Sequence, residues 1–127
     1  MADPKFQHHM AGLKFFGQGQ FEQAIFEYRK ALDLSPDSPE ILNAMAISQS
    51  KLGRHDEAIA TIQRVIALTP EDPFAFTSLS IFLQRQGKIP EAEAAGAKAR
   101  MLNWKDELKR NPNAPRPDND GKMKVIQ

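Results

Sequence analysis

The chain has 127 residues, enough for one domain, and 41% of them are apolar, so we expect a folded protein rather than a disordered one. Its 17 lysines and arginines nearly balance 16 aspartates and glutamates, which excludes a whole-molecule field that would attract nucleic acid or an acidic membrane surface. The absence of cysteine excludes a disulfide framework, a thiolate nucleophile and a cysteine-ligated metal site.

The first ten residues carry no apolar run and one firm positive charge, Lys5, so we expect no secretory signal there. No stretch of about 18 consecutive apolar residues occurs anywhere in the sequence, which predicts that no helix spans a membrane. We therefore expect a cytoplasmic protein that does not bind membranes.

A 34-residue period is the clearest internal pattern of the chain. Gly19, Gly53 and Gly87 are spaced by 34 residues. The same spacing relates three further sets, which are Ala24, Ala58 and Ala92; Ala31, Val65 and Ala99; and Leu34, Leu68 and Leu102. Apolar residues recur three and four apart on both sides of each glycine, so each block predicts two helices joined by a turn.

In chain order, the first block predicts helices near residues 5–18 and 22–34, and small residues on their facing stripes would let them approach closely. Those stripes are expected to be Ala11, Gly12 and Phe15 on the first helix and Ala24, Tyr28 and Ala31 on the second. The next two blocks predict helices near 40–52, 56–68 and 74–86, followed by one that begins near 90.

The helix boundaries of the later blocks have local causes in the sequence. Ser38-Pro39 and Asp72-Pro73 place a polar cap and a first-turn proline at helix starts, where the missing N–H costs nothing. Pro36 and Pro70 stop the preceding helices, because proline disfavours the helical region for the residue before it. No segment predicts a strand, so the fold class is all-α.

The end of the periodic region differs from the earlier blocks. Trp104 stands where the period would place a third proline, so we expect the last helix to continue to about Arg110, with its final turns capping the open end of the core. Trp104 is interpreted as part of that cap. Asn111-Pro112 ends the helix, and residues 111–127 are predicted to form a flexible, proline-containing tail.

The period, the repeated second-helix alanine, and Ala11-Gly12 followed by Phe15 resemble the tetratricopeptide repeat family over residues 5 to about 104. Gly96 and Trp104 depart from the family pattern, as is expected of a last repeat. The resemblance implies three antiparallel helix-turn-helix hairpins in a right-handed superhelix. It places one domain at residues 1–110, with repeats at 5–38, 39–72 and 73–106.

The first helix of each stacked hairpin is expected to line the inside of a curve, so its outward stripe is the candidate binding surface. Leu13, Ile47 and Ile81 are 34 residues apart and would form an apolar ladder along that surface. Lys51 and Arg85 would lie at its edge. The remaining candidate groove residues are Phe6, His9, Phe16, Asn43, Ser50, Phe74 and Thr77. Such a strip predicts binding of a partner helix or an extended peptide.

One subclass of the family grips a carboxyl terminus through Lys, Asn and Arg residues. The matching positions here hold other residues, which are His9, Leu13, Ala44, Phe74 and Ser78. The resemblance therefore does not imply this carboxylate clamp.

Three other functions can be set against a peptide-binding module. An enzyme is not expected, because adjacent His8 and His9 on a helix point about 100° apart and no catalytic or metal-binding motif occurs, so we predict no cofactor. Single-stranded RNA binding is a remote alternative, since the candidate face has no basic stripe. The closer rival is self-association, with the groove filled by a second copy or by Val125 and Ile126 of the tail.

Overall fold

One arrangement recurs at the start of alternate helices, where a polar side chain caps the helix and proline occupies its first position. The computed structural model describes residues 3–117. The three helices of this kind, called first helices below, are α1 (Pro4–Gly17), α3 (Pro39–Lys51) and α5 (Pro73–Arg85). Ser38 and Asp72 accept hydrogen bonds from the backbone N–H groups of Ile41 and Phe74, at 3.5 and 3.0 Å, which confirms both predicted caps.

The second helices begin instead after a glycine in the left-handed region, and they are α2 (Phe21–Leu34), α4 (His55–Leu68) and α6 (Ile89–Arg110). Gly19, Gly53 and Gly87 have φ values of 75°, 80° and 78°. In the first turn the N–H of Gln20 donates to the carbonyl of Phe15 at 2.9 Å, which closes a Schellman motif. A side chain at this φ costs roughly 1–2 kcal/mol, which explains why the period repeats glycine here.

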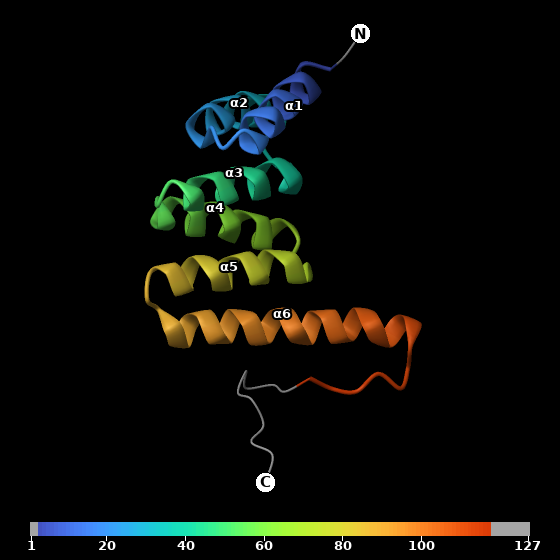
Figure 1. Cartoon of the computed structure of the whole chain (residues 1–127). Coiled ribbons are helices and arrows are strands. Elements are labelled where there is room, and N and C mark those ends of the chain that lie inside the picture. Colours follow the sequence, from blue (N-terminus) through green and yellow to red (C-terminus); the bar gives the residue numbers. More distant parts are fainter. Residues whose placement is uncertain (1–2, 118–127) are drawn as a thin grey trace. The chain divides into compact units, whose positions relative to one another are not determined.

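The chain divides into two compact units, Met1–Thr69 and Pro70–Gln127. In the first unit α1 packs on α2, α2 on α3 and α3 on α4, so two antiparallel hairpins lie side by side (Figure 1). An exposed ion pair between Arg54 and Glu22, at 2.5 Å, joins the starts of α4 and α2. Exposed pairs of this kind contribute at most about 1 kcal/mol, so apolar packing carries the stability.

Close approach of α1 and α2 depends on Gly12 and Tyr28. Gly12 is buried, and the Tyr28 side chain is fully buried across from it. A Cβ atom built on Gly12 would lie 2.6 Å from Cδ1 of Tyr28 and closer still to Cε1. The ring therefore occupies the space that any other residue at position 12 would need, which confirms that Gly12 and Tyr28 face each other as predicted.

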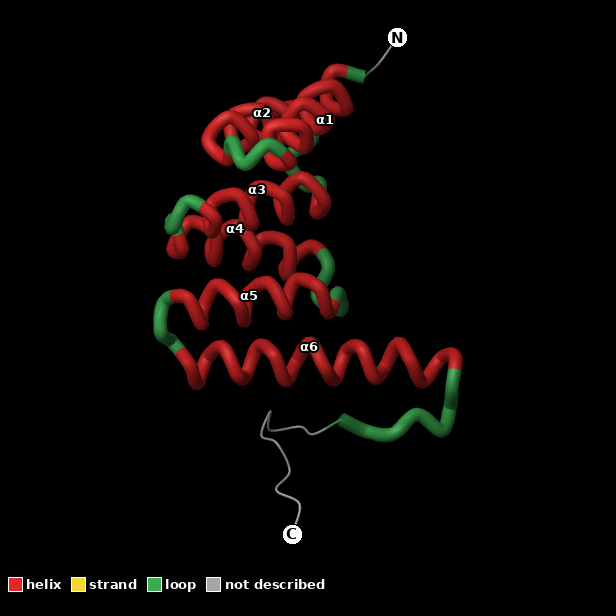
Figure 2. The backbone as a smooth tube through the Cα atoms, viewed as in Figure 1, coloured by secondary structure: helices red, strands yellow, loops and turns green. Residues whose placement is uncertain are grey.

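The second unit contains the hairpin of α5 and α6 and the segment that follows it. Ser80 on α5 donates a hydrogen bond from Oγ to the carbonyl of Ala92 on α6 at 2.7 Å, which joins the helices at a buried position. The loop between them is short, and after α6 the chain turns back along that helix (Figure 2). The predicted extension of the last helix to Arg110 is confirmed.

Across residues 3–117 the regular structure is six helices with no strand, so the predicted all-α class is confirmed. Each helix starts and ends within one residue of the range that the sequence predicts. None of these helices is long and apolar enough to cross a bilayer.

Candidate functional site on the first helices

The outward face of α1 is apolar and open. Phe6, Met10 and Leu13 are all exposed, and their spacing of four and three residues places them on one side of the helix. His9 was predicted for this face but is half-buried, with its ring edge-on to Tyr28 at a centroid distance of 6.2 Å. Met10 therefore joins Phe6 and Leu13 on the exposed face, although the sequence interpretation did not select it.

The corresponding residues of α3 are less exposed. Asn43 and Ile47 are half-buried, Ser50 is buried, and Lys51 at the end of the helix is exposed. Asn43 has a buried side-chain oxygen with no hydrogen-bond partner among residues 3–117. Helix α3 thus exposes only part of the surface that was predicted for it.

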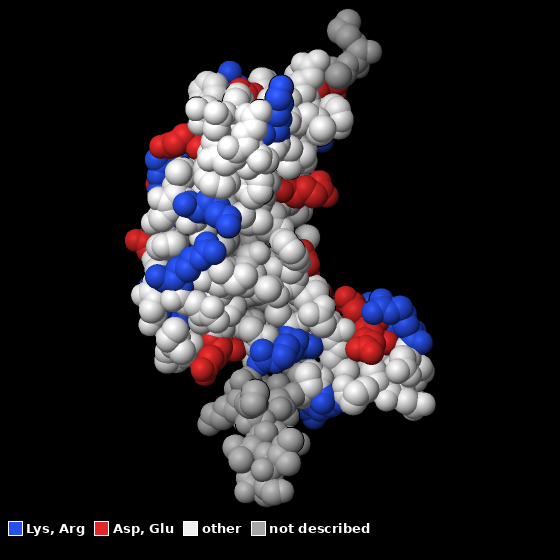
Figure 3. Space-filling model, viewed as in Figure 1, with Lys and Arg blue, Asp and Glu red and all other residues white. Residues whose placement is uncertain are grey.

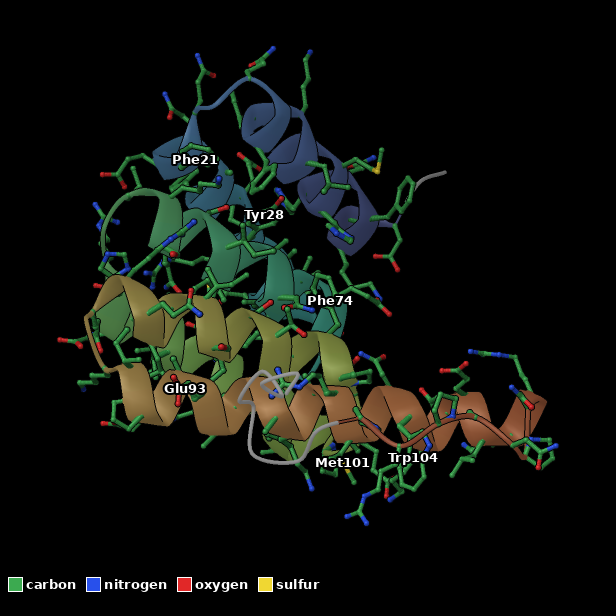
Figure 4. All side chains as sticks on the ribbon, turned by 60° about the horizontal axis from the view of Figure 1, so that its bottom comes forward. Phe21, Tyr28, Phe74, Glu93, Met101 and Trp104 are labelled. Carbon is green, nitrogen blue, oxygen red and sulfur yellow. The ribbon has the colours of Figure 1, made fainter. Side chains whose placement is uncertain are left out.

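The most continuous outward stripe of the second unit lies on α5. Phe74, Thr77, Ile81 and Arg85 are all exposed and follow one another at intervals of three and four residues. Phe74, labelled in Figure 4, has 55% of its surface exposed, and Ile81 has 41%. Thr77 donates its hydroxyl to the carbonyl of Pro73 at 3.1 Å, so its methyl group and the two apolar side chains form the stripe.

Of the remaining predicted site residues, Phe16 is half-buried and packs edge-on against Phe21 of α2, with ring centroids 5.4 Å apart. It therefore stabilises the α1–α2 hairpin. Leu13 belongs to the first unit and Ile81 to the second, and the ladder that would connect them through Ile47 stays a prediction.

Charged residues surround these faces without forming a field of one sign. Both Lys and Arg and Asp and Glu side chains are present on the surface seen in Figure 3. The two adjacent histidines have separate structural roles, since Nδ1 of His8 lies 2.8 Å from Oε1 of Glu27 on α2 while His9 contacts Tyr28.

A hollow lies at the far part of α6, where the chain folds back. Asn111 accepts the N–H of Ala114 at 3.0 Å through its carbonyl, which forms the reversing turn. The indole nitrogen of Trp104 donates to the carbonyl of Ala114 at 3.1 Å. Together the helix and the returning segment form an open hollow of about 220 Å³, lined by Arg100, Asn103, Trp104, Glu107, Pro115 and Pro117. Figure 4 shows Trp104 on the side of α6 along which the segment returns.

Trp104 was predicted to cap the core, and this stays a prediction; the contacts that the structure shows for its ring are with the segment that follows α6. The first residues of the predicted tail, 111–117, are irregular and contact the indole, while residues 118–127, including Val125 and Ile126, lie outside the described residues. The sequence signal for this contact was weak, because a single tryptophan and three prolines do not specify which surfaces meet.

Deleting residues 112–127 is expected to shift the fluorescence of Trp104, the only tryptophan, to longer wavelength, because the ring loses its hydrogen bond and its proline cover. Emission spectra of the native protein measure this shift. A chain that ends at Pro117 is the matched control and should keep the full-length spectrum. Identical spectra for all three chains would contradict the contact.

Residues 15–80, just over half of the chain, match the model of the tetratricopeptide repeat family. No curated protein sequence matches the chain. Solved structures with a similar fold include the first TPR of Spaghetti (RPAP3) bound to the HSP90 peptide SRMEEVD, which is 22% identical. Its TM-score is 0.71, and the match covers 87% of this chain and 81% of that one.

Two further structures show the same likeness. The Yersinia enterocolitica type III secretion chaperone SycD, in complex with a peptide of the translocator YopD, is 17% identical with a TM-score of 0.76, covering 87% of this chain and 88% of that one. The Sgt2 TPR domain from Aspergillus fumigatus is 19% identical with a TM-score of 0.68, covering 96% and 92%. At these identities the likeness establishes the fold.

Proposed function

Because the chain belongs to the tetratricopeptide repeat family, we propose that it is a non-catalytic module that binds a protein or peptide through the outward faces of its first helices. The observation that carries the proposal is the exposed stripe of α5, in which Phe74 and Ile81 remain open to solvent at helical spacing. The face of α1 with Phe6, Met10 and Leu13 gives the first unit a similar surface.

Exposed apolar side chains of this size favour a polypeptide ligand over a nucleic acid. Burying one such side chain contributes about 1.5–3 kcal/mol before the cost of ordering the ligand, so a few contacts give micromolar binding. Tracking a phosphate backbone would require a basic stripe, whereas the exposed stripe residues here are mainly aromatic, aliphatic and hydroxyl groups. An amphipathic helix or an extended segment with spaced apolar residues fits this surface.

The similar structures support a peptide ligand in general rather than one peptide in particular. The first TPR of Spaghetti holds an HSP90 peptide and SycD holds a translocator peptide. The positions that would form a carboxylate clamp hold His9, Leu13 and Phe74 among others in this chain, so the proposed ligand is recognised by apolar residues rather than by a terminal carboxylate.

Selection of peptides from a random display library on the full chain, followed by affinity measurement, tests the proposal. Replacing both Phe74 and Ile81 with serine should weaken the selected peptides by at least about tenfold, because each contact loses apolar burial. Ile89→Ser is the matched control, since Ile89 lies in the same unit on α6 and is 47% exposed, but is not on a first helix.

Equal affinity of the double variant and the wild type for every selected peptide would contradict the proposal. A fold check by circular dichroism belongs to the same experiment, since both side chains are exposed and the helices should persist. The competing occupant of these faces is a second copy of the chain. Light scattering at several protein concentrations tests for this second copy. Self-association is indicated by a mass that falls on dilution and that is lower in the Phe74→Ser, Ile81→Ser variant.

A further inference from the structure

A hollow of about 290 Å³ opens in the first unit where three helices meet, and none of its lining residues belongs to α1. It is bounded by α2, α3 and α4, which pack in sequence in Figure 1. Its lining residues are Arg29, Met45, Gln49, Glu57, Ala60, Thr61 and Arg64. Neither the family nor the apolar first-helix faces account for this combination of two arginines and a buried amide.

The base of the hollow holds a fixed amide group. Gln49 is only 3% exposed, and its Oε1 accepts a hydrogen bond from the hydroxyl of Thr61 at 2.8 Å. Thr61 is itself held on α4, where Oγ1 lies 2.9 Å from the carbonyl of Glu57. With its oxygen engaged by Thr61, the Gln49 amide has its two N–H donors to offer to a ligand.

Two guanidinium groups form the edge of the hollow. Arg64 donates from Nη2 to the carbonyl of Pro36 at 3.2 Å, which holds one side of its fork and leaves its other donors available. Arg29 is exposed and lines the hollow, so its guanidinium group is open to solvent. Glu57 is the one acidic residue in the lining, so the three charged side chains sum to a net positive charge.

We propose that this hollow is a binding site for the carboxylate of an acidic side chain in a partner peptide. A guanidinium fork matches a carboxylate with two parallel hydrogen bonds, and a buried amide adds a third donor. Met45 and Ala60 supply apolar contact for the methylene groups that carry the carboxylate. Glu57 would repel a second nearby acid, so the site selects one acidic residue among neutral neighbours.

The proposal goes beyond the proposed function, because the hollow lies between second helices and α3 and uses none of the exposed residues of α1 or α5. The test is a titration of the ¹⁵N-labelled full chain with a blocked, otherwise neutral pentapeptide that carries one central glutamate. The same peptide with glutamine at its centre is the matched probe. We expect the glutamate peptide to shift the amide signals of Gln49, Ala60 and Thr61, and the glutamine peptide to leave them in place.

Substitutions assign the shift to the arginines. Arg29→Gln alone, and together with Arg64→Gln, should weaken the glutamate peptide by about tenfold or more, because charge-assisted hydrogen bonds are lost. Lys30→Gln is the matched control, since Lys30 is an exposed cation next to Arg29 that lies over the Phe26 ring and outside the hollow. The Lys30→Gln variant should bind the glutamate peptide like the wild type, and added salt should weaken the binding of both proteins to this peptide.

Three results would overturn the proposal. The first is that the amide signals of the hollow do not shift up to saturating peptide. The second is that these signals respond equally to the glutamate and the glutamine peptide. The third is that the Arg29→Gln variant binds the glutamate peptide with unchanged affinity. The Phe74→Ser, Ile81→Ser variant separates this site from the proposed function, because it should respond to the glutamate peptide like the wild type. Loss of binding to selected apolar peptides without loss of the glutamate response would show two independent sites.

Discussion

Replacing Gly12 with alanine is expected to lower the free energy of unfolding by up to about 2 kcal/mol, because forcing extra volume into a packed core usually costs about 1–3 kcal/mol before the gain in helix propensity is subtracted. The new Cβ would lie 2.6 Å from Cδ1 of Tyr28, and the ring is fully buried, so it has no free space to move into. The gain in helix propensity from glycine to alanine, roughly 1 kcal/mol, offsets only part of this cost. Urea unfolding followed by circular dichroism measures the change.

Gly17→Ala is the matched control in the same helix, because a Cβ at that position meets nothing within 4 Å. We expect it to change the free energy of unfolding by less than about 1 kcal/mol. If Gly12→Ala is as stable as Gly17→Ala, the contact between α1 and the Tyr28 ring does not limit how closely the two helices pack.

Alkaline pH is expected to destabilise the first unit through Tyr28. Burial raises the pKa of the Tyr28 phenol from 10.0 to about 12. Below pH 10 the phenol is protonated in both the folded and the unfolded chain, so it adds no pH dependence. Between pH 10 and 12 the unfolded chain ionises first, and the free energy of unfolding falls by up to about 1.4 kcal/mol for each pH unit.

The chain has one tyrosine, so the absorbance of tyrosinate reports on Tyr28 alone and measures its titration directly. Tyr28→Phe is the control variant, and subtracting its pH profile isolates the phenol from the lysines. At neutral pH this variant should be about 1 kcal/mol more stable than the wild type, since the buried phenol oxygen has no hydrogen-bond partner among residues 3–117. A tyrosinate titration centred near 10 in the folded protein would contradict the burial of the group.

The two helices of each hairpin pack closely, and a different pair of residues allows this in each of the three hairpins. Gly12, Ala46 and Ser80 occupy the same place in successive first helices, and Tyr28, Ile62 and Gly96 occupy the same place in the second helices. In the first hairpin the small residue is Gly12 on the first helix, and it leaves space for the Tyr28 ring. In the last hairpin the small residue is Gly96 on the second helix, where an added Cβ would lie 3.4 Å from Oγ of Ser80. A larger residue on one helix is thus matched by a smaller one on the other. This complementarity explains why the departure at Gly96 leaves the last hairpin intact.

Helix positions could be predicted from the sequence because each boundary has a local cause. Proline and a polar cap begin the first helices, and glycine at positive φ ends them. The start of α1 follows the same rule, since Asp3 accepts the N–H of Lys5 at 2.9 Å and Pro4 is the first helical residue.

Side-chain exposure on the first helices was harder to predict, because residues one position apart differ by about 100° around the helix. Small differences in how each helix rolls on its partner therefore decide whether His9 or Met10 faces solvent, and here His9 faces Tyr28. The hollow beside Arg29 and Arg64 depends on three helices at once. No period within one helix could indicate it.

Each compact unit contains one intrinsic optical reporter, with the only tyrosine in α2 and the only tryptophan in α6. Denaturation can therefore be followed in the two halves of the native sequence without attaching a label. Coincident tyrosine and tryptophan transitions would indicate that the hairpins melt as one cooperative block. Separate midpoints would indicate an array whose ends come apart stepwise, as nearest-neighbour coupling between repeats allows.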